Sequence, residues 1–452
     1  MPGRSLRDYP IAAPANSVHW IGRIVAHWKG KLPFPRRVSS GEVKGLPTED
    51  GTSPPVRPVG SAPTAHDALD PSFGTPVHLA SPGAEEPAHT FRPRRLPPPN
   101  GERWLGSPHR VRIAGCGKYL PERVLTNHDL ATIVDTTDEW IRARTGIRER
   151  RIASTEETTA SLSISAARGA LATAGLTPED LDLIIVCTFT GDYGGMPNVA
   201  SVVQHALGAN RAGALDINAA CSGFVYGLGV AHGLVASGLH RTILLIGAET
   251  LSRYLDWHDR TTCVLFGDGA GAVIITSEAT GTPGDRPQSG GLLSLVLGAD
   301  GAGANALLVP AGGTRLPPSH ETIDARQHFI KMDGKDVYRF AVSTVPDACA
   351  EAIAMAGLTV DDIDLFVLHQ ANVRIIRAVI EALGGSWERA FINADRYGNT
   401  SAASVPIALC EAVEMGRLKP GDRVLVAGFG GGLTWGAAVI EWSPFSAVTD
   451  PA

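Results

Sequence analysis

The feature that most constrains the fold of this chain is an internal repeat. The segment ATAGLTPEDLDLIIV, residues 172–186, matches AMAGLTVDDIDLFVL, residues 354–368, at an offset of 182 residues. Eight of the first 14 positions are identical, and each copy has the pattern of a helix end with a C-cap glycine, a turn and a buried apolar strand. We therefore expect two similar α/β halves, residues 109–280 and 281–445, joined by a Gly-rich loop region at 278–305.

The two copies of the repeat differ where their strands end. The first strand continues into CTFTGDYGGMP and the second into HQAN. Ligands usually bind at the carboxyl ends of strands in open α/β sheets. His369, the first residue of HQAN, is therefore a candidate site residue, with a structural role in the core as the alternative.

The segment DINAACSGF places Cys221 between a short strand, residues 214–218, and a run compatible with a helix, residues 222–237. At such a junction the unpaired N–H groups and the helix dipole favour a negative charge, which lowers the pKa of a thiol and makes it nucleophilic. The alternative is a small buried hydrophobic residue. Two later segments, HQAN at 369–372 and YGNTSAAS at 397–404, favour the nucleophile.

Two glycine clusters predict different structures. FGDGAGAVII, residues 266–275, leads into a β-branched strand rather than a helix, which argues against a dinucleotide-binding loop. Residues 430–432 lie between two predicted strands, where glycines permit a tight turn and leave N–H groups accessible, as an oxyanion site requires. A plain hairpin turn is the alternative for this second cluster.

Composition excludes several classes of function. The net charge of −6 over 452 residues does not favour nucleic acid or an anionic membrane as a partner. The chain has no apolar run of about 18 residues and no apolar signal-peptide core at its N-terminus. The six cysteines are scattered without a C-x-x-C pair, so we expect free thiols, no metal site and a cytoplasmic location.

Residues 1–108 differ from the rest of the chain, because they contain 19 of the 32 prolines. We predict that this extension is mostly disordered. Two alternatives remain open. The first 48 residues hold eight basic and two acidic side chains, as in an organelle transit peptide, although serine is scarce. The folded pattern also begins abruptly at VRIAGCGKYLP, which would fit a translation start at Val111.

A cysteine, a histidine and an asparagine thus each follow a predicted strand in a loop rich in small residues. A thiolate can accept an acyl group, and His and Asn can donate hydrogen bonds to a developing enolate, so the set suits thioester chemistry. Papain-like proteases use Cys, His and Asn in the same order. However, Cys221 lacks the C-G-[SA]-C-[WY] surroundings of those enzymes.

These segments resemble the beta-ketoacyl-acyl-carrier-protein synthase III family, which has the thiolase fold. The resemblance rests on DINAACSGF, LFGDGAGA, LHQANVRII, YGNTSAASVPIAL, GFGGGLTWG and TTDEWIRARTGIRERR, and it covers residues 113–442. It implies an α/β fold of five layers, αβαβα, made of two duplicated halves, and a homodimer. Asn399 distinguishes the chain from elongating synthases, which carry a second His there, and from thiolases, which use a second Cys.

The resemblance also implies a role for each residue of the motifs. Cys221 would take the acyl group from an acyl-CoA primer. His369 and Asn399 would stabilise the enolate formed when malonyl-acyl-carrier protein loses carbon dioxide. The N–H groups of Cys221 and Gly431 would form the oxyanion hole, and no cofactor beyond the substrates is implied.

Further residues are implied in binding. Those matching coenzyme A contacts are Trp140, Arg144, Arg260 and Asn372, with Trp140 and Arg260 on the two faces of the adenine. Those matching the carrier-protein segment are Gln370, Ala371, Asn372, Val373 and Arg374. The acyl-pocket walls would be Leu251, Phe266, Ile330 and Phe429, with Met196 reaching across the dimer interface.

One departure from the family concerns carrier-protein docking. After HQANVRII the family often has a basic pair, whereas this chain has Glu381 and Ala382. Arg339 and Arg377 could supply the positive charge instead. The resemblance leaves open the primer and a homologous enzyme of a secondary-metabolite pathway, including one that acylates oxygen or nitrogen. A non-catalytic partner subunit would lack the nucleophile, so Cys221 argues against it.

Overall fold

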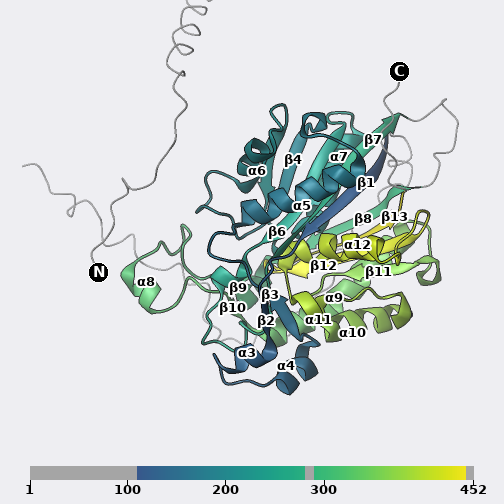
Figure 1. The fold of residues 1–452 in the computed structure, drawn as a ribbon. Helices are drawn as coiled ribbons and strands as arrows, with labels where there is room; N and C mark the ends of the chain where they lie inside the picture. Colours follow the sequence, from purple (N-terminus) through teal and green to yellow (C-terminus); the bar gives the residue numbers. More distant parts are fainter. Residues whose placement is uncertain (1–108, 280–289, 444–452) are drawn as a thin grey trace, which may run out of the picture. The chain divides into compact units, whose positions relative to one another are not determined.

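Two β-sheets form the frame of the protein in the computed structural model, which describes residues 109–279 and 290–443 (Figure 1). The first sheet has the order β1-β7-β6-β4-β5 and the second the order β11-β12-β13-β8. The strands of the first sheet are β1 (His109–Tyr119), β4 (Leu183–Cys187), β5 (Gly213–Ile217), β6 (Thr242–Glu249) and β7 (Gly269–Ala279). Those of the second are β8 (Gly291–Ala299), β11 (Leu365–Leu368), β12 (Arg423–Gly430) and β13 (Thr434–Glu441).

The two sheets repeat one topology. In each, the first strand pairs antiparallel with the last, the last pairs antiparallel with the strand before it, and that strand lies parallel to the strand of the sequence repeat. The place of β5 is taken in the second sheet by a single parallel bridge between Phe366 and Ala390. The duplication expected from the sequence is therefore present in the fold.

The repeated sequence has the same local structure in both copies. Gly175 and Gly357 adopt left-handed conformations, with φ of 68° and 71°, at the ends of helices α5 (Thr159–Ala174) and α9 (Gly334–Met355). The Asp182 carboxylate then accepts a hydrogen bond from the backbone N–H of Arg241 (2.7 Å), as Asp364 does from that of Arg423 (2.8 Å). The identical Gly and Asp residues therefore serve the same turn twice.

Helices cover both sheets and separate them, giving five layers (Figure 1). Alternate residues of each strand face different layers, because side chains alternate across a strand. Ile184 and Val186 of β4 pack with α5 and with α6 (Val199–Leu207), whereas Leu183 and Ile185 face the central helices. The central layer consists of α7 (Gly223–Ala236) and α12 (Ser404–Glu414), and α9 and α10 (Val373–Leu383) cover the second sheet.

Smaller elements cluster at one end of the two sheets (Figure 1). The hairpin β2 (Val124–Thr126) and β3 (Glu149–Arg151) lies with helices α3 (Asn127–Ala131) and α4 (Asp138–Thr145). A second pair, β9 (Leu307–Leu308) and β10 (Lys331–Met332), flanks α8 (His320–Asp324), and α11 (Ala394–Tyr397) precedes the Asn399 loop. The 3-10 turns are η2 (Pro178–Asp180), η3 (Ala220–Ser222), η4 (Leu251–Tyr254), η5 (Gly301–Ala306), η6 (Val360–Asp362), η7 (Trp387–Arg389) and η8 (Ser401–Ala403).

The predicted five-layer thiolase-like class is confirmed, while the exact bounds of the two halves stay a prediction. The expectations for residues 1–108, and for residues 280–289 of the loop predicted at 278–305, lie outside the described residues. The rest of that loop prediction is wrong, because residues 291–299 form strand β8 and residues 301–306 form η5. All six cysteines are buried and free. Within the ranges described, no helix is long and apolar enough to cross a membrane.

Candidate active site

Cys221 lies in η3, directly before α7, and is 6% exposed. The predicted strand and helix around it, 214–218 and 222–237, correspond to β5 and α7 within one residue at each end. Gly430, at the end of β12, lets the cysteine pack against the second sheet. A Cβ atom there would lie 2.7 Å from the Cys221 nitrogen and 3.2 Å from its Sγ.

The structure contradicts the expectation that Cys221 has a lowered pKa. Burial raises the pKa of its thiol to about 12, and the negative charge of Glu249 adds to this effect. A hydrogen bond between the Ser401 hydroxyl and the sulfur acts in the opposite direction. The sequence pattern identifies the helix terminus, but it does not show that desolvation of the thiolate is the larger influence.

His369 directly follows β11 and is buried at the inner edge of the second sheet. Its Nδ1 lies 2.6 Å from the Ser404 Oγ, and its ring meets that of Phe429 edge to face at 5.2 Å. Burial lowers the pKa of the imidazole to about 3, so the ring is neutral at neutral pH. The backbone N–H of Gln370 donates to the same Ser404 oxygen (3.4 Å). Assigning the Ser404 hydroxyl as the donor to Nδ1 places the ring proton on Nε2.

Asn399 is held by hydrogen bonds at both its backbone and its side chain. Its backbone N–H donates to the Leu265 carbonyl (2.8 Å), and its Oδ1 accepts from the Ser401 N–H (2.8 Å). Since the amide oxygen is used in this way, the NH2 group is the part of the side chain available to a ligand.

The three candidate catalytic side chains line one cavity of about 90 Å3, together with Phe429 and Gly430. A second cavity, of about 340 Å3, shares Cys221 and Phe266 with the first. Cys221 therefore lies at the junction of the two cavities.

The predicted acyl-pocket residues differ in their position relative to the two cavities. Phe266 and Ile330 line the larger cavity, and Phe429 lines the smaller one. Leu251 is fully buried and packs against Phe266 and Ile330, so it supports the wall from behind. Met196 is 88% exposed and lies outside both linings within the single chain.

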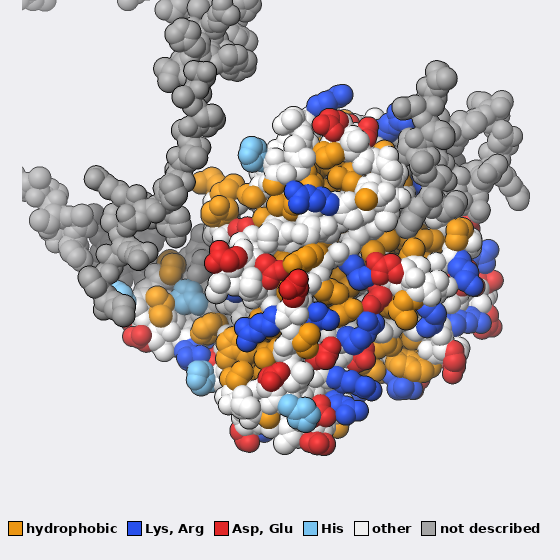
Figure 2. Space-filling model, viewed as in Figure 1, with side chains coloured by type: hydrophobic (Ala, Val, Ile, Leu, Met, Phe, Trp, Pro, Cys, Tyr) orange, Lys and Arg blue, Asp and Glu red, His pale blue; other side chains and the backbone are white. Residues whose placement is uncertain are grey.

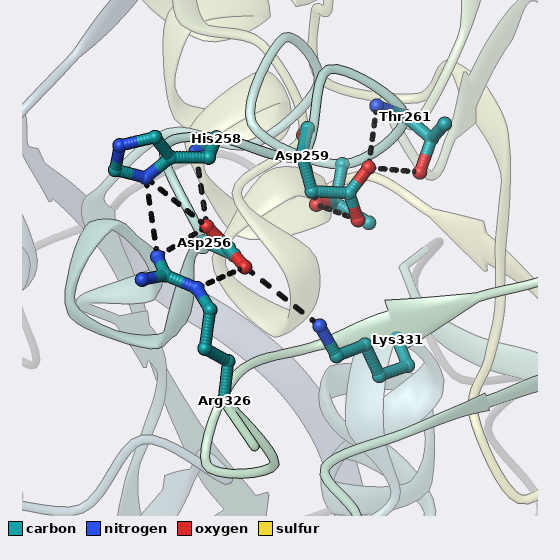
Figure 3. A network of polar contacts seen from close by, with 7 residues as sticks. Asp256, His258, Asp259, Thr261, Arg326 and Lys331 are labelled. Atoms are coloured by element: carbon teal, nitrogen blue, oxygen red, sulfur yellow. Dashed lines mark hydrogen bonds and ion pairs between the residues drawn. The ribbon is translucent and has the colours of Figure 1, made fainter. Parts of the chain in front are cut away.

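An ion-pair network around Asp256 (Figure 3) involves chain neighbours of Tyr254 and Ile330, which line the larger cavity. The buried carboxylate of Asp256 accepts two hydrogen bonds from Arg326, at 2.7 and 2.5 Å, and lies 3.8 Å from the Lys331 ammonium. The Arg326 guanidinium lowers the pKa of Asp256 to about 2. Next to Lys331, the backbone N–H of Ile330 donates to the Tyr254 carbonyl (2.8 Å), and both of these residues line the cavity.

The four residues predicted to bind coenzyme A come together, and one of them, Asn372, lines the smaller cavity. The guanidinium carbons of Arg144 and Arg260 lie 4.4 and 5.1 Å from the centre of the Trp140 ring. The Asn372 side chain lines the cavity and donates to the Arg144 carbonyl (3.1 Å). A flat ring between Trp140 and Arg260 needs about 7 Å, two carbon contact distances, so Arg260 must move outward to admit one.

The predicted carrier-protein segment divides between interior and surface. Arg374 is exposed, and Ala371, Asn372 and Val373 are partly exposed. Gln370 is 1% exposed, its NH2 donates to two backbone carbonyls, and its Oε1 accepts from Asn393 and Ala394. A surface contact by Gln370 does not fit this burial, because all its polar atoms hold the segment leading to Asn399.

Several residues at the site are not predicted from the sequence. Ser401 and Ser404 belong to the motif that contains Asn399, so a signal for them was present. Glu249 ends an apolar strand, and Leu307 of β9 and Tyr254 of η4 both line the larger cavity. Nothing in their local sequence indicates a site.

The fold and the cysteine between its halves define a condensing enzyme of the thiolase fold, and comparisons with known proteins specify the family. Residues 215–301 match the family "3-Oxoacyl-[acyl-carrier-protein (ACP)] synthase III", and residues 353–442 match its C-terminal family. The chain is 52% identical to the beta-ketoacyl-[acyl-carrier-protein] synthase III of Symbiobacterium thermophilum over 332 residues, 74% of this chain and 98% of the relative. The chain belongs to the beta-ketoacyl-acyl-carrier-protein synthase III family.

Solved structures agree with this assignment. The 3-oxoacyl-[acyl-carrier-protein] synthase III of Aquifex aeolicus is 44% identical, with a TM-score of 0.67, over 74% of this chain and 100% of that one. The priming beta-ketosynthase of the R1128 polyketide biosynthetic pathway is 37% identical, also with a TM-score of 0.67, over 74% and 97%.

Proposed function

We propose that this chain catalyses the decarboxylative condensation of an acyl-CoA primer with malonyl-acyl-carrier protein, the step that starts a fatty acid chain. The observation that carries the proposal is the meeting of Cys221, His369 and Asn399 at one cavity. The first comes from one half of the fold and the other two from the second half. The larger cavity beside the sulfur offers room for the acyl chain.

In the first step the Cys221 sulfur attacks the thioester carbonyl of the primer and coenzyme A leaves. The negative charge on the carbonyl oxygen is stabilised by the N–H groups of Cys221 and Gly431. Each such donor typically contributes ~10²–10³ in rate. The acyl chain then extends between Phe266 and Ile330.

In the second step malonyl-acyl-carrier protein takes the place of coenzyme A and loses carbon dioxide. The resulting enolate accepts hydrogen bonds from the His369 Nε2–H and from the Asn399 amide. The neutral imidazole suits this role, because it donates without supplying a proton that would quench the carbanion. The carbanion attacks the acyl thioester, and the Cys221 thiolate is released.

Coenzyme A is proposed to bind with its adenine between Trp140 and Arg260. The Arg260 side chain is 44% exposed and contacts Asp135 at the surface, so it can turn outward by giving up these exposed contacts. Arg144 and Asn372 lie beside the pantetheine path into the smaller cavity. No cofactor beyond the two substrates takes part in this proposal.

Acyl-carrier protein is proposed to dock on the N-terminal half of α10. Arg374 and Arg377 are exposed there, while Glu381 stands where the family often has a basic residue. Arg339 of α9 is exposed as well. On the face drawn in Figure 2, basic and acidic side chains are interspersed, so docking depends on these few arginines rather than on a broad positive field.

A cytoplasmic homodimer is the proposed form of the enzyme. β5 ends the first sheet, so its outer edge is unpaired within the described part of the chain. An open edge favours pairing with a second copy. Met196 follows β4 near this edge and is exposed, as a residue reaching into a second subunit would be.

Replacing Cys221 with Ala tests the proposal directly. We expect acyl-CoA to leave no acyl group on the Cys221→Ala enzyme, whereas the wild type gains the mass of one acyl group. An acyl adduct retained on a cysteine of the variant would contradict the assignment. A primer screen by mass spectrometry, with acetyl-, branched and longer acyl-CoA, separates chain initiation from the alternative role in a secondary-metabolite pathway.

A further inference from the structure

One buried carboxylate near Cys221, that of Glu249, has no role in the proposed mechanism. Glu249 ends β6 and is fully buried. Its Oε2 accepts hydrogen bonds from the Thr188 hydroxyl (3.0 Å) and from the Thr190 N–H (3.1 Å) and hydroxyl (2.5 Å). Its Oε1 accepts from the Ser401 hydroxyl (3.0 Å). Among the described residues, no Lys or Arg forms an ion pair with it.

The duplication of the fold shows why this carboxylate reaches the site. β6 and β12 are equivalent strands of eight residues, so Glu249 occupies the position of Gly430. Gly430 contacts Cys221, and Glu249 contacts the equivalent turn of the other half, at Ser401. Glu249 thus has a side chain at the position where Gly430 has none and where Cys221 packs in the other half.

Ser401 connects the carboxylate to the sulfur. It lines the same cavity as Cys221 and influences the pKa of the thiol. Its hydroxyl donates to Glu249, so its oxygen can accept the thiol proton. It adopts a left-handed conformation, with φ of 49°, as does Ala220 at the equivalent position before Cys221, with φ of 45°. The backbone strain at both turns marks them as functional positions.

We propose that Glu249, acting through the Ser401 hydroxyl, accepts the proton of Cys221 when the nucleophile forms. The thiol proton moves to the Ser401 oxygen while the Ser401 proton moves to Oε1. This leaves a Cys221 thiolate and a neutral Glu249 carboxyl. After acyl transfer the proton returns by the same hydroxyl to the departing coenzyme A sulfur, so that the step consumes no other reactant. This inference rests on the proposed acyl transfer to Cys221.

Charge considerations favour this route. Burial raises the pKa of Glu249 to about 7, so the carboxyl is ready to exchange a proton at neutral pH. Its charge opposes ionisation of Cys221, and this opposition ends when the carboxyl takes the proton. The pair then carries one negative charge both before and after the proton transfer. His369 is a poor alternative base, since burial lowers its pKa to about 3.

The ionisable groups around Glu249 do not offer it another proton donor of comparable pKa. Cys187, on β4, is fully buried and its pKa is raised, and the pKa of Tyr254, in η4, is raised as well. The remaining partners are neutral hydroxyl and N–H groups. The groups that face the carboxylate are Cys187, Thr188, Phe189, Thr190, Cys221, Tyr254 and Ser401.

The test is the pH profile of Cys221 alkylation by iodoacetamide, followed on the Cys221 peptide by mass spectrometry. This readout needs neither primer nor carrier protein, so it is independent of the proposed function. We expect wild-type reactivity to rise through neutral pH. In Glu249→Gln and Ser401→Ala the rise should move to higher pH, and the rate at pH 7 should fall roughly 100-fold or more. Because the two residues act as one relay, the double variant should be no slower than either single variant.

Two controls separate a relay from a structural effect. Ser401→Ala is expected to fold, since Ala220 already occupies the equivalent left-handed position. Asp268→Asn removes another fully buried carboxyl of the same half, whose partners are Ala153 and Ser252, and should leave the profile unchanged. Faster alkylation in Glu249→Gln would overturn the proposal, because removing a mere repelling charge lowers the thiol pKa. An unchanged profile in both relay variants would overturn it too.

Discussion

Removing the amide of Asn399 should separate the two half-reactions. In Asn399→Ala the enolate loses one hydrogen-bond donor in a buried site, which typically costs ~10²–10³ in rate, or about 3–4 kcal/mol. The cavity at the Cys221 sulfur is otherwise unchanged. We therefore expect acylation of Cys221 to stay within about threefold of wild type, a difference below 1 kcal/mol.

The same substitution also affects stability, and a second variant corrects for this. Asn399→Ala leaves the buried Ser401 N–H without its acceptor, at a cost of ~1–3 kcal/mol. Asn399→Asp keeps that acceptor but replaces the donor facing the enolate by a carboxylate oxygen. It should keep the hydrogen bond from the Ser401 N–H. At a pH where the new carboxyl is ionised, it should lose decarboxylation at least as completely as Asn399→Ala.

The assay measures each half-reaction alone. Intact-protein mass spectrometry follows the acyl adduct formed from acyl-CoA, and release of labelled carbon dioxide follows malonyl-acyl-carrier protein. Equal loss of both activities in Asn399→Asp, with unchanged thermal unfolding, would refute the reasoning. Asn399 would then serve Cys221 rather than the enolate.

Three further substitutions test packing and charge. Gly430→Ala should slow acylation roughly tenfold or more and cost ~1–3 kcal/mol of stability, because its Cβ would lie 2.7 Å from the Cys221 nitrogen. Gly233→Ala is the control, since no atom lies within 4 Å of its Cβ. Equal acylation by both variants would refute the packing argument. Asp256→Asn should lower the free energy of unfolding by ~1–3 kcal/mol and broaden the primer range in competition assays. An unchanged primer range would show that the cavity wall at Ile330 does not depend on the ion pairs. The buried Glu249 carboxyl, whose pKa is raised from 4.5 to about 7, should make wild-type stability fall by about 3 kcal/mol as the pH rises through this interval. Urea unfolding should show this part of the pH dependence to be absent in Glu249→Gln, and parallel curves for the two proteins would contradict it.

The sequence predicts those parts of the fold and the site that depend on short, local segments. The repeat at 172–186 and 354–368 indicates the duplicated halves, since the Gly and Asp residues of each copy serve one turn. The turn at Cys221 is recognisable because a strand, small residues and a helix follow each other within a short segment. His369 could be placed at a strand end for the same reason.

The remaining parts depend on contacts between segments far apart in the chain. Glu249 is the last residue of an apolar strand, and only its approach to Ser401, 152 residues away, shows its relation to the site. The pKa of Cys221 depends on how completely the second sheet covers it, and the sequence does not show this coverage. Gln370 lies in a recognised motif, yet its burial follows from backbone partners at 391–394.

The duplication explains why one site can hold both a nucleophile and the groups that serve it. Each half supplies a turn before a central helix and a strand end that packs against it, and the two turns meet at the middle of the molecule. In one half the turn carries Cys221 and needs Gly430 beside it. In the other the equivalent positions are Ala402 and Glu249, so the residue beside the turn can be large and charged. Two copies of one backbone arrangement have thus acquired different side chains, and the site requires both.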